Sequence, residues 1–297
     1  MKVQSTNLRL LVNKISDFIF FNITRLAAFA LFVILLAIFT ILFIEAKPAI
    51  DAFGVNFLIS SKWAPNLEIF GGFPAIAGSI LSTLIAMALA VPLALGIAIF
   101  LSEITIQKLK TPIGTAIELL AAIPSVIYGM WGLFYFAPVL RAMFGGNGLG
   151  LLSAGIVLSI MILPFMASVA RDAMNTTPDI LKESAYALGA TKWDVIKSVI
   201  IPYAQAGILG AGVLALGRAI GETMAVTFVM GNVHKIPSGI TSAATSIPVT
   251  LANEFTEADS ALYYSSLFYL ALILFIISFI VIGIAKFIFF RKLRAVR

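Results

Sequence analysis

Long apolar runs separated by short polar intervals set the pattern of this chain. A run of about twenty apolar residues is long enough to cross the hydrocarbon core of a bilayer as a helix. We expect six such spans, at about residues 26–44, 74–101, 113–139, 149–170, 206–230 and 261–285. Prolines lie inside three of them, with a kink expected at Pro92. At Pro124 and Pro164 an ordinary kink is the favoured form, and a broken helix whose exposed N-terminus attracts anions is the alternative. The pattern predicts an all-α membrane protein with six transmembrane helices.

The composition separates the chain from soluble proteins. Of its 297 residues, 61% are hydrophobic and 11% are charged, whereas soluble domains have about 45–50% apolar and about 25% charged residues. There is no cysteine, and the only histidine is His234, so we expect no metal, redox centre or other cofactor. No nucleotide-binding loop or hydrolase motif is present. We therefore expect no enzyme activity, and any ATP that drives transport must be hydrolysed on another chain.

The formal net charge of +6 is explained by membrane topology and not by binding to nucleic acid. Basic residues gather before the first span, between the second and third, between the fourth and fifth, and after the sixth. The intervals on the opposite side hold these basic residues: Lys47, Lys62, Arg141 and Lys235. Because basic loops stay in the cytoplasm, we expect both termini and the interval 171–205 to be cytoplasmic.

The interval 171–205 carries the signals of two short helices joined by a turn. Residues 177–179, Thr-Pro-Asp, form one helix start, with the threonine hydroxyl as the expected cap. Thr191, with Asp194 as the acidic half of a capping box, forms the second start. Gly189 suits the turn between the two helices.

One face of this interval is apolar, and its lysines are left for water or for acidic groups of a partner. The apolar residues are Ile180, Leu181, Ala185, Leu188, Val195, Ile196 and Val199, and the lysines are Lys182, Lys192 and Lys197. Such a face suits a docking surface, but it equally suits a loop that lies on the lipid. The face alone leaves both alternatives open.

The residue spacing in this interval resembles the EAA motif of permeases of binding-protein-dependent ABC importers. Glu183, Ser184 and Ala185 stand at its start, Gly189 follows after three further residues, and Pro202 stands at its end. Ser184 is a small departure from that motif. The resemblance implies a coupling helix seated on a cytoplasmic dimer of ATP-binding subunits, together with an external binding protein. Pro202 is expected to end the second helix or to begin the fifth span.

Two longer stretches resemble the C-type phosphate permeases within that family. They are ELLAAIPSVIYGMWGLF at 118–134 and GRAIGETMAVTFVMGN at 217–232. The likeness implies a bacterial inner-membrane subunit that imports inorganic phosphate beside a second, homologous permease subunit. It begins near residue 71, so we expect a peripheral part at 1–70 (cytoplasmic N-terminus, first helix and external loop) and a five-helix permease core at 71–297.

Arg218 and Glu222 are charges expected inside the membrane. An arginine near the middle of a span costs about 2.5–3.5 kcal/mol on insertion scales, which makes a functional role the first expectation. Glu222 lies four residues on, along the same helix face. A guanidinium matches two phosphate oxygens, so we expect Arg218 to line the phosphate route and Glu222 to orient it. The alternative is an ion pair used for assembly.

A stripe of small residues accompanies this charged face. It consists of Gly210, Leu214, Gly217 and Gly221. A close helix contact along such a stripe is expected to turn the charged face toward the interior of the bundle.

Other signals are weaker. Glu118 is interpreted as an acid in interfacial water rather than a partner of the interval 171–205 or of a neighbouring span. His234 is interpreted as a loop residue, and the interval 231–260 as an external loop able to meet a binding protein.

Rival functions remain open at this point. One is an importer of the same architecture for another oxyanion or solute. The other is a secondary transporter or channel that needs no ATPase.

Overall fold

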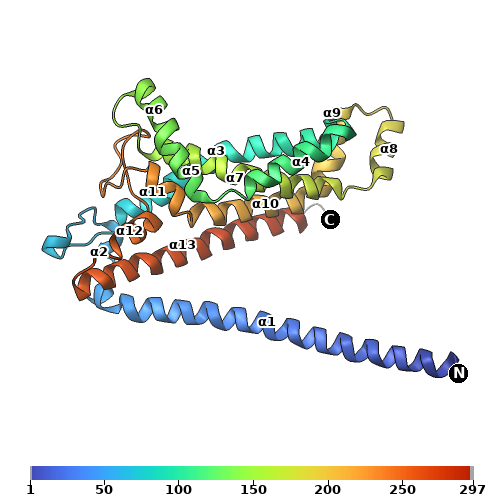
Figure 1. Cartoon of the computed structure of the whole chain (residues 1–297), viewed down its shortest axis with the longest axis horizontal. Helices are drawn as coiled ribbons and strands as arrows, with labels where there is room; N and C mark the ends of the chain where they lie inside the picture. The colour runs from blue at the N-terminus through green and yellow to red at the C-terminus, as the bar shows by residue number, and fades with distance from the viewer. Residues whose placement is uncertain (1, 295–297) are drawn as a thin grey trace.

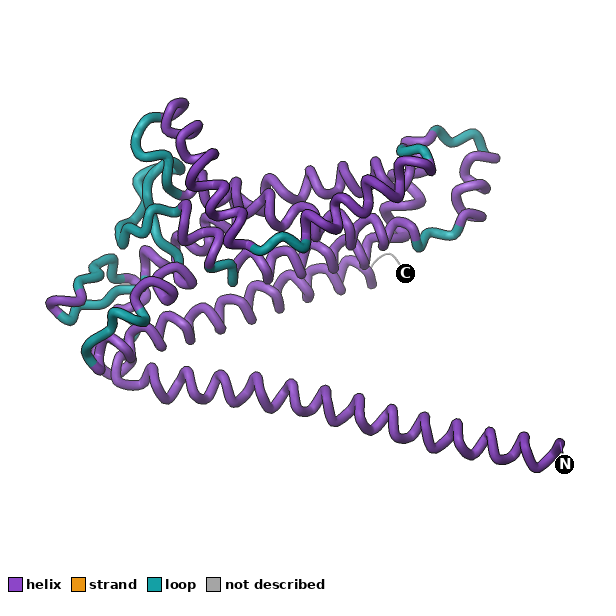
Figure 2. Tube along the Cα trace, viewed as in Figure 1, coloured by secondary structure: helices purple, strands orange, loops and turns teal. Residues whose placement is uncertain are grey.

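The chain folds into long helices that run along one common direction. A computed structural model describes the backbone of residues 2–294 and the side chains of residues 17–287. Within this part, six helical segments are long and apolar enough to span a membrane, which confirms the expected fold class. They are Asp17–Phe53, Phe73–Ile104, Ser125–Phe144, Leu151–Asn175, Lys192–Ile220 and Ala261–Phe287. Loops join them at the two ends of the bundle (Figure 2).

Helix α7 (Leu151–Asn175) lies at the centre of the bundle. It packs along α3 (Phe73–Ile99), and also against α4 (Gln107–Ala121) and α10 (Ile201–Ile220). The buried ridge of α3 is made of alanines four residues apart: Ala86, Ala90, Ala94 and Ala98. Such small side chains let two helix backbones approach closely within a membrane.

The first helix is peripheral. Helix α1 (Lys2–Phe53) contacts α13 (Ala261–Arg294) only near its end and diverges from it toward its start (Figure 1). Ser265 joins the two helices, because its hydroxyl donates to the Glu45 carbonyl at 2.7 Å and accepts from the Ala49 amide at 3.0 Å. The start of α1, the end of α13 and α8 (Asp179–Ala187) all lie at the same end of the molecule (Figure 1).

The third and fifth spans expected from the sequence, 113–139 and 206–230, are each broken, and the apolar segments Ser125–Phe144 and Lys192–Ile220 lie to one side of their breaks. In the third span, α4 ends at Ala121 and α5 (Ser125–Trp131) begins after Pro124, so the expectation of a simple kink there was wrong. The helix continues through the π-helical segment η3 (Gly132–Phe136) into α6 (Ala137–Phe144). In the fifth span, α10 ends at Ile220 and α11 (Met224–Val229) follows a three-residue break that the apolar run did not signal. Pro92 lies inside the continuous helix α3.

The fifth span also begins earlier than expected. Helix α9 (Lys192–Val195) runs through a π-helical segment, η4 (Ile196–Ile200), directly into α10. A second π-helical segment, η2 (Phe100–Ile104), ends α3. Pro202 therefore neither ends the second helix nor begins the span, but lies inside this continuous helix, two residues after the π-helical segment.

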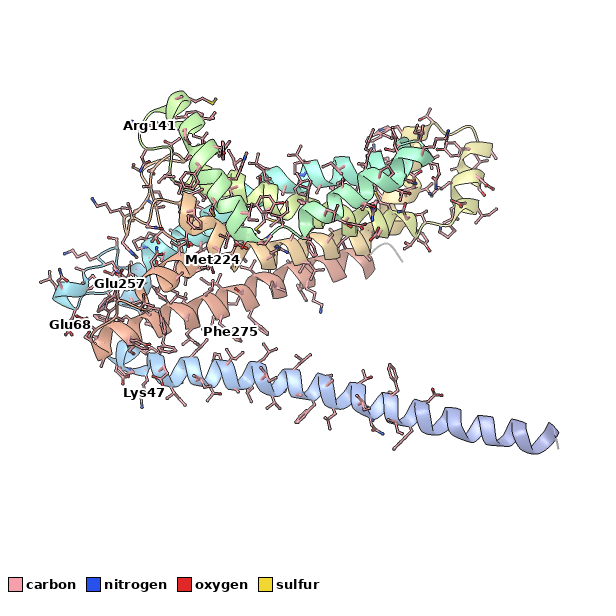
Figure 3. The ribbon with its side chains drawn as sticks, in the orientation of Figure 1. Lys47, Glu68, Arg141, Met224, Glu257 and Phe275 are labelled. Atoms are coloured by element: carbon pink, nitrogen blue, oxygen red, sulfur yellow. The ribbon has the colours of Figure 1, made fainter. Side chains whose placement is uncertain are left out.

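The expected external loop at 231–260 contains a helix. Helix α12 (Ile247–Glu254) has Ser246 as its N-cap, and the serine hydroxyl accepts from the Val249 amide at 3.4 Å. Its first turn is buried against α3 and α13. Short helical turns, α2 (Asn56–Ile59) and η1 (Pro65–Leu67), lie at the same end of the bundle. Lys47, Glu68, Arg141 and Glu257 mark this end in Figure 3.

Glu254, the last residue of α12, ties the segments at this end together. Its carboxylate accepts hydrogen bonds from Trp63 Nε1 at 2.6 Å and from the Tyr263 hydroxyl at 2.8 Å, and it pairs with His234 Nε2 at 2.5 Å. The Trp63 and His234 rings stack with centroids 5.1 Å apart. Burial raises the pKa of Glu254, but the hydrogen bonds and the charge of His234 lower it by more. The net result is a pKa below the ordinary value. His234 is thus a loop residue, as expected, with a partner that the sequence did not indicate.

This carboxyl group predicts a pH dependence of stability. The pKa of Glu254 is lower in the folded chain than in the unfolded chain. Its contribution to the free energy of unfolding is therefore fully present above pH 4.5, the ordinary pKa, and is lost as the pH falls through the pKa of the folded chain. Between about pH 5 and about pH 3, the wild type should lose melting temperature more steeply than Glu254→Gln. Glu257→Gln, at an exposed acid nearby, is the matched control. If the melting temperatures of wild type and Glu254→Gln fell in parallel with pH, a lowered pKa of Glu254 in the folded chain would be contradicted.

Two glycines of α3 provide a test of the packing. A methyl group at Gly78 would overlap the Thr245 carbonyl oxygen, whereas one at Gly96 would meet no atom within 4 Å. Gly78→Ala should therefore destabilise the chain by about 1–3 kcal/mol, as overpacking typically does. Gly96→Ala should not destabilise it, because alanine favours helix over glycine. Thermal melting in detergent compares the two, and equal melting temperatures would refute the close contact.

Candidate anion pathway and coupling surface

The two broken spans meet inside the bundle. Helix α5 packs on α11 so closely that a methyl group at Gly129 would come within 2.9 Å of Ala225 Cα and 2.8 Å of the Phe228 ring. Met224, the first residue of α11, lies between the two ends of the molecule (Figure 3). Paired half-helices at membrane depth are the arrangement in which many transporters hold their substrates.

Arg218 lies in the last turn of α10, immediately before the break in the fifth span. Its side chain is exposed, and it makes no ion pair with any described residue. The negative end of the α10 dipole favours a cation there. The structure therefore presents a guanidinium beside the break in the fifth span, with its hydrogen-bond donors available to groups outside the described part of the chain.

Glu222 lies within the same break and does not pair with Arg218. Its Oε1 accepts a hydrogen bond from the Ala225 amide at 3.2 Å, in the first turn of α11. This bond satisfies one of the backbone amides that the start of a helix leaves unpaired. In this structure Glu222 shapes the break and does not contact the guanidinium.

The small-residue stripe of α10 does not turn the charged face inward, so that expectation was wrong. A methyl group at Gly217 would lie 3.3 Å from Ile282 of α13, but one at Gly210 would meet nothing within 4 Å. Leu214 is 57% exposed. The face that carries Arg218 is therefore open at the surface of this chain.

Tyr128 is a residue of this region that sequence reasoning missed. It lies on α5, is 9% exposed, and its hydroxyl donates to the Leu120 carbonyl at 2.7 Å. The bond crosses the break in the third span and adds to the one that the same carbonyl accepts from the Ile123 amide at 3.3 Å. Tyr128 is also within electrostatic range of Arg218. The available signal was a phenol hydroxyl four residues after Pro124 in an apolar run.

The interval 171–205 forms the expected first short helix, α8, but the second is not separate, because α9 is the start of the continuous helix of the fifth span. Gly189 has φ +86°, which suits its place in the turn between them. The capping box is confirmed, because the Asp194 amide donates to the Thr191 hydroxyl and the Thr191 amide donates to the Asp194 carboxylate at 3.0 Å. The first helix start was wrong in detail. Pro178 is the N-cap of α8, and the buried Thr177 hydroxyl has no hydrogen-bond partner in the described part of the chain.

Helix α8 presents the exposed apolar surface of this region. Leu188 is 90% exposed and Ile180 is 66% exposed, while Ala185 is half-buried. Glu183 and Ser184 are exposed, and the Ser184 hydroxyl donates to the Ile180 carbonyl at 2.7 Å. The expected apolar face is thus divided, because Val195 and Ile196 of the second helix are buried against the bundle.

Two charged residues near this end have partners that were not expected. Lys182, expected to be available for water or a partner, pairs with Glu103 of η2 at 3.0 Å. Glu118 of α4 pairs with Arg171 of α7 at 2.8 Å, which corrects its interpretation as an acid in water. Both pairs join segments that lie far apart in the sequence.

Comparison with known proteins supports a transport role. The family described as "Binding-protein-dependent transport system inner membrane component" matches residues 69–294. Phosphate transport system permease protein PstC of Mesorhizobium japonicum is 47% identical over 297 residues, which cover 93% of this chain and 91% of the relative. The protein of that name from Pasteurella multocida is 44% identical, covering 93% of this chain and 92% of the relative.

Solved structures share the fold. A chain of a bacterial alginate ABC transporter, crystallised with a periplasmic protein that holds an alginate pentasaccharide, aligns with a TM-score of 0.60 at 15% identity. The alignment covers 84% of this chain and 88% of that chain. The chain therefore belongs to the family of inner-membrane components of binding-protein-dependent transport systems, and is a transport subunit and not an enzyme.

Proposed function

We propose that this chain is the permease subunit of an ATP-driven importer that takes inorganic phosphate from an external binding protein into the cytoplasm. The observation that carries the proposal is the combination of relatives named for phosphate transport with Arg218, which pairs with no described residue and stands at the break in the fifth span. A planar guanidinium donates to two phosphate oxygens at once. An anion that leaves water for a pathway through the membrane needs such hydrogen-bond donors in place of its hydration shell.

In this proposal Arg218 and Glu222 form the translocation site. Arg218 attracts the anion, and Glu222 holds the break in which the arginine stands. The acid also adds a negative charge nearby, which weakens the hold on phosphate and helps its release. The open face of α10 suits a second, homologous permease subunit that would close the pathway, because an arginine left against lipid is costly.

The coupling surface in this proposal is α8, with Glu183, Ser184, Ala185, Gly189 and Pro202 as the motif that positions it. Its exposed apolar residues would seat in a dimer of cytoplasmic ATP-binding subunits. This orientation places the α8 end and both termini in the cytoplasm and the Glu254 end outside, in a bacterial inner membrane. We divide the chain into a peripheral part, 1–70, and the permease core, 71–297, which contains the loop at 171–205.

Loss of the guanidinium should abolish most uptake. We expect Arg218→Gln to lower phosphate uptake about tenfold or more in the assembled complex in liposomes, because a hydrogen bond to a charged group contributes about 1.5–3 kcal/mol. Arg218→Lys, which keeps the charge but not the fork, should retain part of the activity.

The same assay tests the substrate. Phosphate, sulfate and molybdate are supplied separately with ATP inside or outside the vesicles. Undiminished phosphate uptake by Arg218→Gln, with assembly verified, would remove the arginine from the pathway. Preference of the wild type for another oxyanion would refute phosphate as the substrate.

A charge on the exposed face of α8 should prevent docking. Leu188→Glu introduces an acid at a 90% exposed leucine and should reduce the amount of ATP-binding subunit that co-purifies. A leucine buried in a protein interface contributes about 1.5–3 kcal/mol, so the loss should be about tenfold or more in affinity. Leu67→Glu, at a 71% exposed leucine near the opposite end, is the control. Equal co-purification of both variants would exclude this face as the docking surface.

A further inference from the structure

Helix α8 has little contact with the rest of the chain. It projects from the end of the bundle (Figure 1), and its residues are exposed except for Lys182 and Ala185, which are half-buried. These two residues therefore mark the inner side of α8, opposite the surface proposed to meet the ATP-binding subunit. Any force that this subunit applies to α8 must pass through the inner side or through the chain at its two ends.

Lys182 makes a shielded ion pair from this inner side. Its Nζ lies 3.0 Å from Glu103 Oε1, and the two side chains are only 17% and 10% exposed. Asp179 lies farther from the same Nζ, at 3.8 Å, and its side chain is 87% exposed. A shielded, hydrogen-bonded pair is stronger than a pair in water, so Glu103 is the principal partner of Lys182.

Glu103 belongs to the second span. It lies in η2, the π-helical end of α3, where Leu101 and Ser102 are buried. The Ser102 hydroxyl also lies 3.6 Å from the sulfur of Met174, near the end of α7. A displacement of Glu103 would therefore act on the ends of both α3 and α7, the two helices that pack together along their length.

We infer that the Lys182–Glu103 ion pair is the tether through which movement of α8 is passed to the second span. This inference rests on the proposed function. Lys182 and Glu103 are positioning residues, since neither contacts the substrate route. The tether connects the ATP-driven subunit to α3 independently of the continuous path from α9 through η4 into the fifth span, so two spans are moved together.

The experiment uses the whole complex in liposomes with its ATP-binding subunits and binding protein. The variants are Glu103→Gln, Lys182→Met and the exchange Glu103→Lys with Lys182→Glu, and the control is Asp179→Asn. We expect both single variants to assemble and hydrolyse ATP, with phosphate imported per ATP falling about fivefold or more, the lower range of allosteric coupling. The charge-swapped double variant should regain much of the wild-type phosphate import per ATP, and Asp179→Asn should keep the wild-type value.

A second measurement separates the tether from the substrate. Hydrogen exchange of the backbone amides of 182–187 should become faster in Glu103→Gln than in Asp179→Asn, which removes only an exposed acid of the first turn of α8. A wild-type complex that hydrolyses ATP but imports no phosphate would refute the proposed substrate, and the exchange rates would still test the tether. Wild-type import per ATP in both single variants, or unchanged amide exchange in Glu103→Gln, would overturn the inference.

Discussion

The close packing of α3 on α7 is the contact on which the rest of the structure depends. Lipid tails are as apolar as the side chains of the helices, so apolar residues give no reason for helices to associate inside a membrane. The alanine ridge of α3 gives these two helices a reason to associate, because its small side chains let the helix backbones approach closely over several turns. Helices α4, α10 and α11 are placed against the remaining sides of α7.

Broken helices in a membrane carry a cost that this chain meets with polar side chains. A backbone amide or carbonyl without a partner in hydrocarbon costs several kcal/mol. The Glu222 carboxylate satisfies an amide after one break, and the Tyr128 hydroxyl adds a second hydrogen bond to a carbonyl before the other. With Glu222 engaged in this way, Arg218 is left without a partner among the side chains of residues 17–287. The same bond that stabilises the break therefore keeps the guanidinium available.

Local signals could be read from the sequence, whereas contacts between distant segments could not. The six spans follow from apolar length, and the Thr191 capping box and the Gly189 turn follow from chemistry within a few residues. The partner of Lys182 is 79 residues away and that of Arg171 is 53 residues away, so no local pattern indicated either pair. The break in the fifth span contains no proline, and the helix at 247–254 was overlooked although Ser246 and Pro248 are start signals.

The π-helical segment η4 sets the direction in which the two ends of the fifth span face. A π turn accommodates one residue more than an α-helical turn would, which corresponds to a rotation of about 100° around the helix axis. Removing that residue would restore regular winding and turn α8 by about this angle relative to Arg218. A single amino acid thus sets the rotational register between the cytoplasmic arm and the membrane arginine, so deletions here should be far less tolerated than substitutions.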